Sequence, residues 1–159
     1  MQDQQRHGDL RQHDAQHKRR SVSLPVAIAR ERIQALEQAM QAAPEDVHAW
    51  QKTEHHFAPG LYVRVLYVKA GTVFTGALHK TQHFYSLMLG AVSVVDSHGN
   101  TQHLEAPHLG ITTPGTKRAI YVHEDAIWVN FHPTDKTDPD EIIAEITAES
   151  FEQYDAGVA

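Results

Sequence analysis

The sequence predicts an all-β fold, and the features of residues 53–132 carry that prediction. Short segments rich in Val, Ile, Thr and aromatic residues follow one another there, as in Leu61–Val68. Turn residues separate the segments, including Pro59-Gly60, Pro114-Gly115 and the Ser-His-Gly-Asn of residues 97–100, which has the composition of a hairpin turn. Many short strands at regular spacing are typical of an antiparallel sandwich or barrel.

An amphipathic helix is predicted before the strands, over residues 23–44. Apolar side chains recur there at spacings of three and four, and Pro44 ends the pattern. Such a stripe needs an apolar partner, and two partners fit: the outside of a sheet, or the same helix in a second subunit, which would make a homodimer. The stripe consists of Val26, Ala29, Ile33, Leu36 and Met40.

A C-terminal helix is predicted over residues 138–150. Asp138 suits the N-cap, Pro139 suits the first turn, and the acidic residues that follow complement the positive end of the helix dipole. Isoleucines give the helix an apolar side, so we expect it to pack across the outer face of the barrel.

The charge is unevenly distributed along the 159 residues. Residues 1–22 are rich in Gln, His, Arg and Asp, and we expect them to form a flexible polar arm. Residues 25–159 hold nine basic and 17 acidic residues, a balance of −8. A domain this acidic is a poor partner for nucleic acid, so none is expected.

Composition also limits the chemistry and the compartment. The chain has no Cys, which excludes disulfides and thiolate ligands. No run of about 18 apolar residues is present, and the N-terminus lacks the apolar core of a secretion signal. We therefore expect a cytoplasmic protein with no membrane partner.

Two histidines stand four residues apart inside the β-rich region. His79 and His83 share strand parity, so both can face a common interior if the chain bends between them. Imidazoles that converge in a lined cavity can hold a metal ion. His123 is the expected third ligand, if its face of the strand is inward, and His132 is a further candidate on the face of Trp128.

The strand pattern and two segments resemble the cupin family of small jelly-roll barrels. In the family's first motif a pair of histidines precedes a Glu and then a Gly; here His79 matches the second histidine, His83 stands at the Glu position, and Gly90 follows seven residues later. Pro114-Gly115 resembles the turn of the second motif, with Arg118 or Ala119 in place of its histidine. The sequence of these segments most resembles that of small cupin-like proteins of bacteriophage and bacterial genomes, most of which have no assigned activity. The resemblance implies a cupin-like jelly-roll barrel between the two helices, and such barrels often pair.

The predicted site combines a metal ion with a small anionic ligand. An all-imidazole set of His79, His83 and His123 suits Zn, Fe, Ni or Cu better than Mg or Ca. Other side chains are expected to bind the ligand, because a basic residue can pair with a carboxylate or phosphate. Lys117 and Arg118 are neighbours of opposite strand parity, so only one of them is expected to line the pocket. These ligand-binding candidates are Tyr85, Lys117, Arg118, Tyr121 and His132.

Three functions fit this pattern. The chain can be a metal-dependent cupin enzyme of unspecified reaction class. It can instead bind a small molecule without converting it, which the lack of a carboxylate in the two motif segments favours. It can also be a structural or accessory protein of phage type, without metal. Serine hydrolase and dinucleotide motifs are missing from the sequence.

Overall fold

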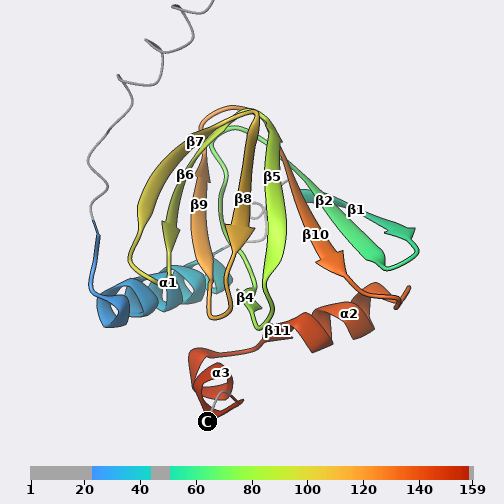
Figure 1. Cartoon of the computed structure of the whole chain (residues 1–159). Coiled ribbons are helices and arrows are strands. Elements are labelled where there is room, and N and C mark those ends of the chain that lie inside the picture. Colours follow the sequence, from blue (N-terminus) through green and yellow to red (C-terminus); the bar gives the residue numbers. More distant parts are fainter. Residues whose placement is uncertain (1–22, 44–50, 158–159) are drawn as a thin grey trace, which may run out of the picture.

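The computed structural model describes residues 23–43 and 51–157, so the predicted arm of residues 1–22 lies outside the described residues. β-strands are the main secondary structure of the described chain, and three helices accompany them (Figure 1). The elements in chain order are α1 (Val26–Gln41), β1 (Gln51–Ala58), β2 (Leu61–Val68), β3 (Val73–Thr75), β4 (Leu78–His79), β5 (His83–Leu89), β6 (Ala91–Asp96), β7 (Thr101–Glu105), β8 (His108–Thr112), β9 (Arg118–Val122), β10 (Ala126–Pro133), α2 (Pro139–Ile146), β11 (Thr147–Ala148) and α3 (Phe151–Gly157).

The strands form two facing antiparallel sheets and one small ribbon. The larger sheet has the order β1-β2-β10-β5-β8, the second has the order β3-β9-β6-β7, and β11 pairs with β4. Neighbours that are distant in sequence, such as β2 beside β10, give the crossed connections of a jelly roll. Within the described residues the two large sheets share no hydrogen-bonded edge, so the barrel is not closed. The predicted all-β, cupin-like jelly roll with flanking helices is confirmed.

The core lies between the two large sheets, where strand alternation places apolar side chains. Ile120 and Val122 of β9 face Leu87 of β5 and Trp128 of β10, all at most 5% exposed. Because successive side chains of a strand point to opposite faces, residues of the same parity on these strands also point inward. This rule decides below which histidines can meet.

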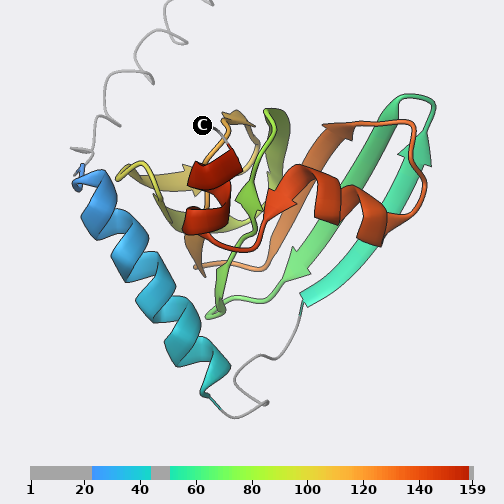
Figure 2. The same cartoon turned by 90° about the horizontal axis from the view of Figure 1, so that it is seen from below.

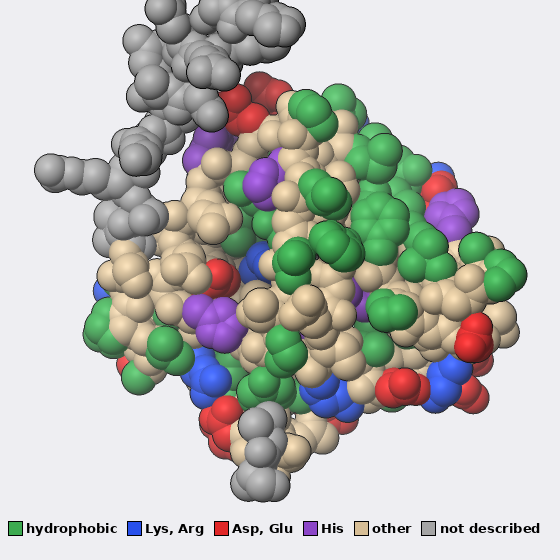
Figure 3. Space-filling view, viewed as in Figure 1, with side chains coloured by type: hydrophobic (Ala, Val, Ile, Leu, Met, Phe, Trp, Pro, Cys, Tyr) green, Lys and Arg blue, Asp and Glu red, His purple; other side chains and the backbone are tan. Residues whose placement is uncertain are grey.

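The outer face of the larger sheet carries exposed apolar side chains. Phe84 and Met88 of β5 and Leu109 and Ile111 of β8 are each at least half exposed. Figure 3 shows hydrophobic side chains gathered over these strands. Patches of this kind often mark interaction surfaces. The expected homodimer stays a prediction. This patch is a second candidate dimer surface, in addition to α1.

Helix α1 packs against its own barrel. Ala29 and Ile33 are buried, Met40 contacts the core between the sheets, and the helix lies beside β3. A charged contact adds to this packing: Glu37 accepts hydrogen bonds from the Lys117 ammonium at 2.7 and 2.9 Å. The predicted apolar stripe therefore has a partner within the chain, although Val26 remains 46% exposed.

The C-terminal segment covers the end of the barrel rather than its outer face (Figure 2). Asp138 caps α2 as expected, accepting from the backbone N–H groups of Asp140 and Glu141. The helix ends at Ile146, earlier than predicted, because Thr147 turns extended and pairs with His79 across β11 and β4. Ile142 and Ile146 pack on Tyr62. No helix in the described part of the chain is long and apolar enough to cross a membrane.

Candidate metal centre

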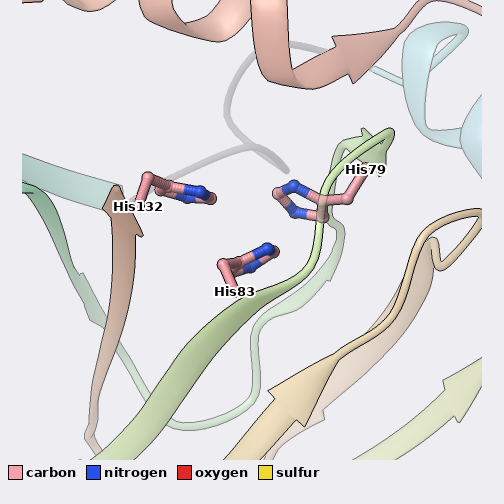
Figure 4. A group of neighbouring side chains, drawn as sticks. All are labelled: His79, His83 and His132. Atoms are coloured by element: carbon pink, nitrogen blue, oxygen red, sulfur yellow. The ribbon is translucent and has the colours of Figure 1, made fainter. Parts of the chain in front are cut away.

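Three histidines meet at the barrel end that α2 and β11 cover. His79 ends β4, His83 begins β5, and His132 lies near the end of β10 (Figure 4). His83 shares the inward parity of the buried Tyr85, and His132 shares that of Trp128. His83 and His132 are 3% and 2% exposed, and His79 is partly buried. Strand alternation and the β4–β5 bend thus bring three separate segments together.

The three rings offer converging nitrogen atoms. One nitrogen from each ring lies within 4.8 Å of the other two. The ring centroids are 4.1 Å apart for His83 and His132 and 4.3 Å apart for His79 and His83. His79 Nδ1, His83 Nε2 and His132 Nδ1 are buried and have no hydrogen-bond partner. Unpartnered buried polar atoms are costly, so their clustering fits a site that a cation completes.

A contact to the backbone sets the tautomer of one ring. His83 Nδ1 lies 3.3 Å from the carbonyl oxygen of Thr81, which can only accept a hydrogen bond. The proton therefore belongs on Nδ1, which leaves the lone pair of the unpartnered Nε2 free. A metal-binding histidine commonly has its other ring nitrogen held in this way.

Burial keeps all three imidazoles neutral at physiological pH. It lowers the pKa of His79 to about 2 and that of His132 to about 3, with smaller contributions from neighbouring imidazoles and the guanidinium of Arg64. Burial also lowers the pKa of His83. Neutral imidazoles carry the lone pairs that a divalent ion needs, and transition metals such as Zn, Fe, Ni and Cu suit nitrogen ligands.

His123, the expected third ligand, lies elsewhere. It follows the last residue of β9, where Ile120 and Val122 point into the core, so alternation places Tyr121 and His123 on the outer face. His123 is exposed, and its Nε2 lies 2.7 Å from Ser93 Oγ. The expectation that its face of β9 is inward was wrong, and His132 occupies the third position of the cluster.

Arg118 is the basic residue that turns inward. Its guanidinium lies over the Tyr85 ring at 4.7 Å from the centroid, and Nη1 donates to Thr112 Oγ1 at 2.9 Å. Its positive charge contributes to lowering the pKa of His79 and of His83. Arg118 and Tyr85 also line a polar cavity of about 200 Å³ together with His98 and Thr116. Asp96 lines the same cavity, but among the described residues Arg118 forms no ion pair, so an anionic group there could meet its guanidinium.

The other two ligand-binding candidates on this segment face away from the cavity. The Lys117 ammonium forms an ion pair with Glu37 of α1, so its charge is already compensated. Tyr121 is 43% exposed and packs edge-on against His123 on the outer face. Sequence parity had already separated Lys117 from Arg118, and the register of β9 decides which of them is inside.

Sequence reasoning undervalued His132 and did not single out Arg64. The signal for His132 was present, because it shares parity with Trp128, a large apolar residue that indicates the core face of its strand. Arg64 of β2 lies opposite Asn130 of β10 and adds positive charge near the histidines. Its position depends on the pairing of β2 with β10, which no local pattern encodes.

Comparison with known proteins identifies the fold. No protein-family model and no curated protein matches the sequence. Among solved structures, salicylate 1,2-dioxygenase from Pseudaminobacter salicylatoxidans matches with a TM-score of 0.53 at 16% identity, over 80% of this chain and 37% of that one. A conserved protein with a double-stranded β-helix domain from Klebsiella pneumoniae matches with a TM-score of 0.48 at 17% identity, over 57% and 82%. The EutQ protein of Clostridium difficile matches with a TM-score of 0.44 at 19% identity, over 54% and 70%.

The fold and the histidine cluster together define the class. The chain has the cupin fold, and three of its histidines could hold a metal ion. Its recognition from the sequence as cupin-like is confirmed at the level of the fold.

Proposed function

We propose that this protein binds a divalent transition metal through His79, His83 and His132 and a small anionic molecule beside Arg118. The observation that carries the proposal is the set of three buried ring nitrogens, one per histidine, that have no hydrogen-bond partner. When bound, such an ion supplies Lewis acidity to an oxygen-bearing ligand. The choice among Zn, Fe, Ni and Cu is left to measurement.

The surrounding residues prepare the site for an anion. Among the described residues, the permanently charged groups that act on the pKa values of the three histidines are the guanidinium groups of Arg64 and Arg118. A divalent ion would add further positive charge in the same region. A carboxylate or phosphate would offset that charge, and the Arg118 guanidinium can bind such a group through two hydrogen bonds.

The covering segment buries side chains at this end of the barrel. Ile142 and Ile146 of α2 pack on Tyr62, whose ring stacks on His132 at a centroid distance of 5.9 Å. Lys80 N–H donates to the carbonyl oxygen of Ile146 at 2.7 Å, which ties the end of α2 to the residue that follows His79. Low dielectric strengthens the interaction between a bound ion and an anionic ligand.

A binding module that does not convert its ligand is the second candidate function. One observation favours it: no carboxylate of the described residues is among the groups that shift the pKa values of the three histidines. A carboxylate close to the ion would be the usual group to carry protons during turnover. An imidazole nitrogen whose lone pair holds a metal ion cannot also accept a proton as a general base.

Metal analysis of purified protein tests the proposal. We expect about one tightly held transition-metal ion per chain after dialysis, lost in His83→Ala and in His132→Ala. His56→Ala is the matched control, because His56 lies exposed on β1, and it should retain the ion. Thermal unfolding of each variant separates loss of metal from loss of fold. Unchanged metal content in a folded His83→Ala/His132→Ala double variant would overturn the proposal.

A further inference from the structure

A second group of histidines lies on the outer face of the smaller sheet, on the opposite side of the sheet wall from His79, His83 and His132. Ser93 of β6 lies between His103 of β7 and Tyr121 of β9, which are its direct cross-strand partners. His123 follows β9, and its ring packs edge-on against that of His103 at a centroid distance of 5.0 Å. Two imidazoles and a hydroxyl therefore share one surface.

Both imidazoles direct a nitrogen at the same hydroxyl group. Ser93 Oγ lies 2.7 Å from His123 Nε2 and 3.4 Å from His103 Nδ1. The hydroxyl has one proton, so it can donate to only one of the two nitrogens. When both nitrogens present lone pairs, the hydroxyl leaves one of them without a donor.

A carboxylate favours the tautomer of His103 that metal binding needs. Glu105 Oε1 lies 3.3 Å from His103 Nε2, on the other side of the ring from Ser93. A carboxylate can only accept, so it favours the proton on Nε2 and leaves the lone pair on Nδ1, which faces Ser93 and His123. A carboxylate that holds an imidazole, which in turn binds the metal, is a common arrangement in zinc proteins.

We propose that His103 and His123 chelate a divalent transition-metal ion at this surface, with Glu105 positioning His103. The two ligand atoms are His103 Nδ1 and His123 Nε2, and the Ser93 hydroxyl or water completes the set with oxygen. Nitrogen ligands with few negative charges suit Zn, Ni and Cu rather than Mg or Ca.

The site opens onto a hollow that could admit a further ligand of the ion. A cavity of about 540 Å³ is lined by His103, Glu105, His123 and Glu124, and its apolar wall comes from the β5–β6 turn and from Pro107. Because His103 and Glu105 are partly solvent-exposed, with side chains 31% and 64% accessible, this ion exchanges faster than one held by the buried cluster.

A serine nucleophile explains the same atoms less well. Ser93 lies in the middle of β6, which is hydrogen-bonded to β7 on one side and to β9 on the other. The backbone N–H groups around Ser93 are therefore engaged in the sheet and do not form an oxyanion hole beside Oγ. Chelation needs only the lone pairs that the geometry already presents.

Zinc titration of the full chain by calorimetry tests the proposal, with the ion count taken from native mass spectrometry. In the wild type we expect a weaker binding event in addition to any tight one. His103→Ala and His123→Ala should each remove this weaker event, and the double variant should lose no more than either single variant, because both residues hold one ion. Glu105→Gln should weaken it about 10- to 100-fold.

His56→Ala serves again as the control for an exposed strand histidine, and the histidines of residues 1–22 are common to all variants. All the substituted side chains are at the surface, so melting temperatures should stay close to that of the wild type. The proposal is overturned if the His123→Ala isotherm equals that of the wild type. Additive losses in the two single variants would overturn it too, since they would indicate two separate one-histidine contacts. If His83→Ala and His132→Ala remove the tight ion and keep the weaker event, the weaker site is separate from the buried cluster, as proposed.

Discussion

Acidification should destabilise the metal-free protein well above the pH at which carboxylates titrate. His79 and His132 have folded-state pKa values of about 2 and about 3, whereas an unfolded-state histidine titrates near 6.5. As the pH falls below 6.5, the unfolded chain takes up protons that the folded chain does not. Stability is therefore fully present above pH 6.5 and is lost progressively as the pH falls toward the folded pKa values.

The size of this effect follows from the proton linkage. Between pH 7.5 and pH 5.0, one histidine that stays neutral in the folded state and titrates near 6.5 in the unfolded state costs about 2 kcal/mol. His79 and His132 together should cost about 4 kcal/mol, and His83 adds to the loss in the same direction. A total this large is a substantial part of the stability of a typical domain, about 5–15 kcal/mol.

Urea unfolding at 25 °C in the presence of a chelator measures this loss of stability. The unfolding is monitored by circular dichroism and repeated at half-unit steps of pH. The test variant is His132→Phe, which removes one titrating group and keeps a ring to stack on Tyr62. It should lose about 2 kcal/mol less than the wild type over the same pH range. His56→Ala, on the exposed β1 strand, should follow the wild-type curve. A wild-type stability that stays flat from pH 7.5 to 5.0, or an unchanged pH slope in His132→Phe, would refute the reasoning.

Two further predictions concern Arg118, which begins β9, and Lys117, which precedes it. Arg118→Gln should weaken the binding of acetate or phosphate at least about 10-fold, since hydrogen bonds to a charged group are worth about 1.5–3 kcal/mol. Trp128 fluorescence reports the binding, because Trp128 stacks on Tyr85 beneath the guanidinium. Arg32→Gln, at an exposed position of α1, is the control, and equal affinities in the two variants would contradict the assignment. Glu37→Gln should cost about 1–3 kcal/mol of unfolding free energy, because the Lys117 ammonium, 10% exposed, loses its carboxylate. Urea unfolding measures it against Glu31→Gln on the same helix, and equal losses would show that the ion pair does not hold α1 in place.

Local patterns were enough to predict α1, α2 and the main strands, but not β11 or α3. The Asp138 cap, the isoleucine spacing of α2 and the Gly and Pro turns between strands each act over a few residues, so the sequence alone predicts them. The helix end at Ile146 was missed because β11 pairs with β4, a contact between residues far apart in the chain.

The pair His79 and His83 also followed from the sequence by itself, since strand parity and a bend suffice to place both rings on one side. The third histidine was decided by the tertiary structure. His123 and His132 were both candidates, and only the register of β9 and β10 on their neighbours shows that one side chain points out and the other in. The physical reason is that alternation along a strand fixes relative orientation, while the burial of Ile120, Val122 and Trp128 between the sheets fixes which face is inside.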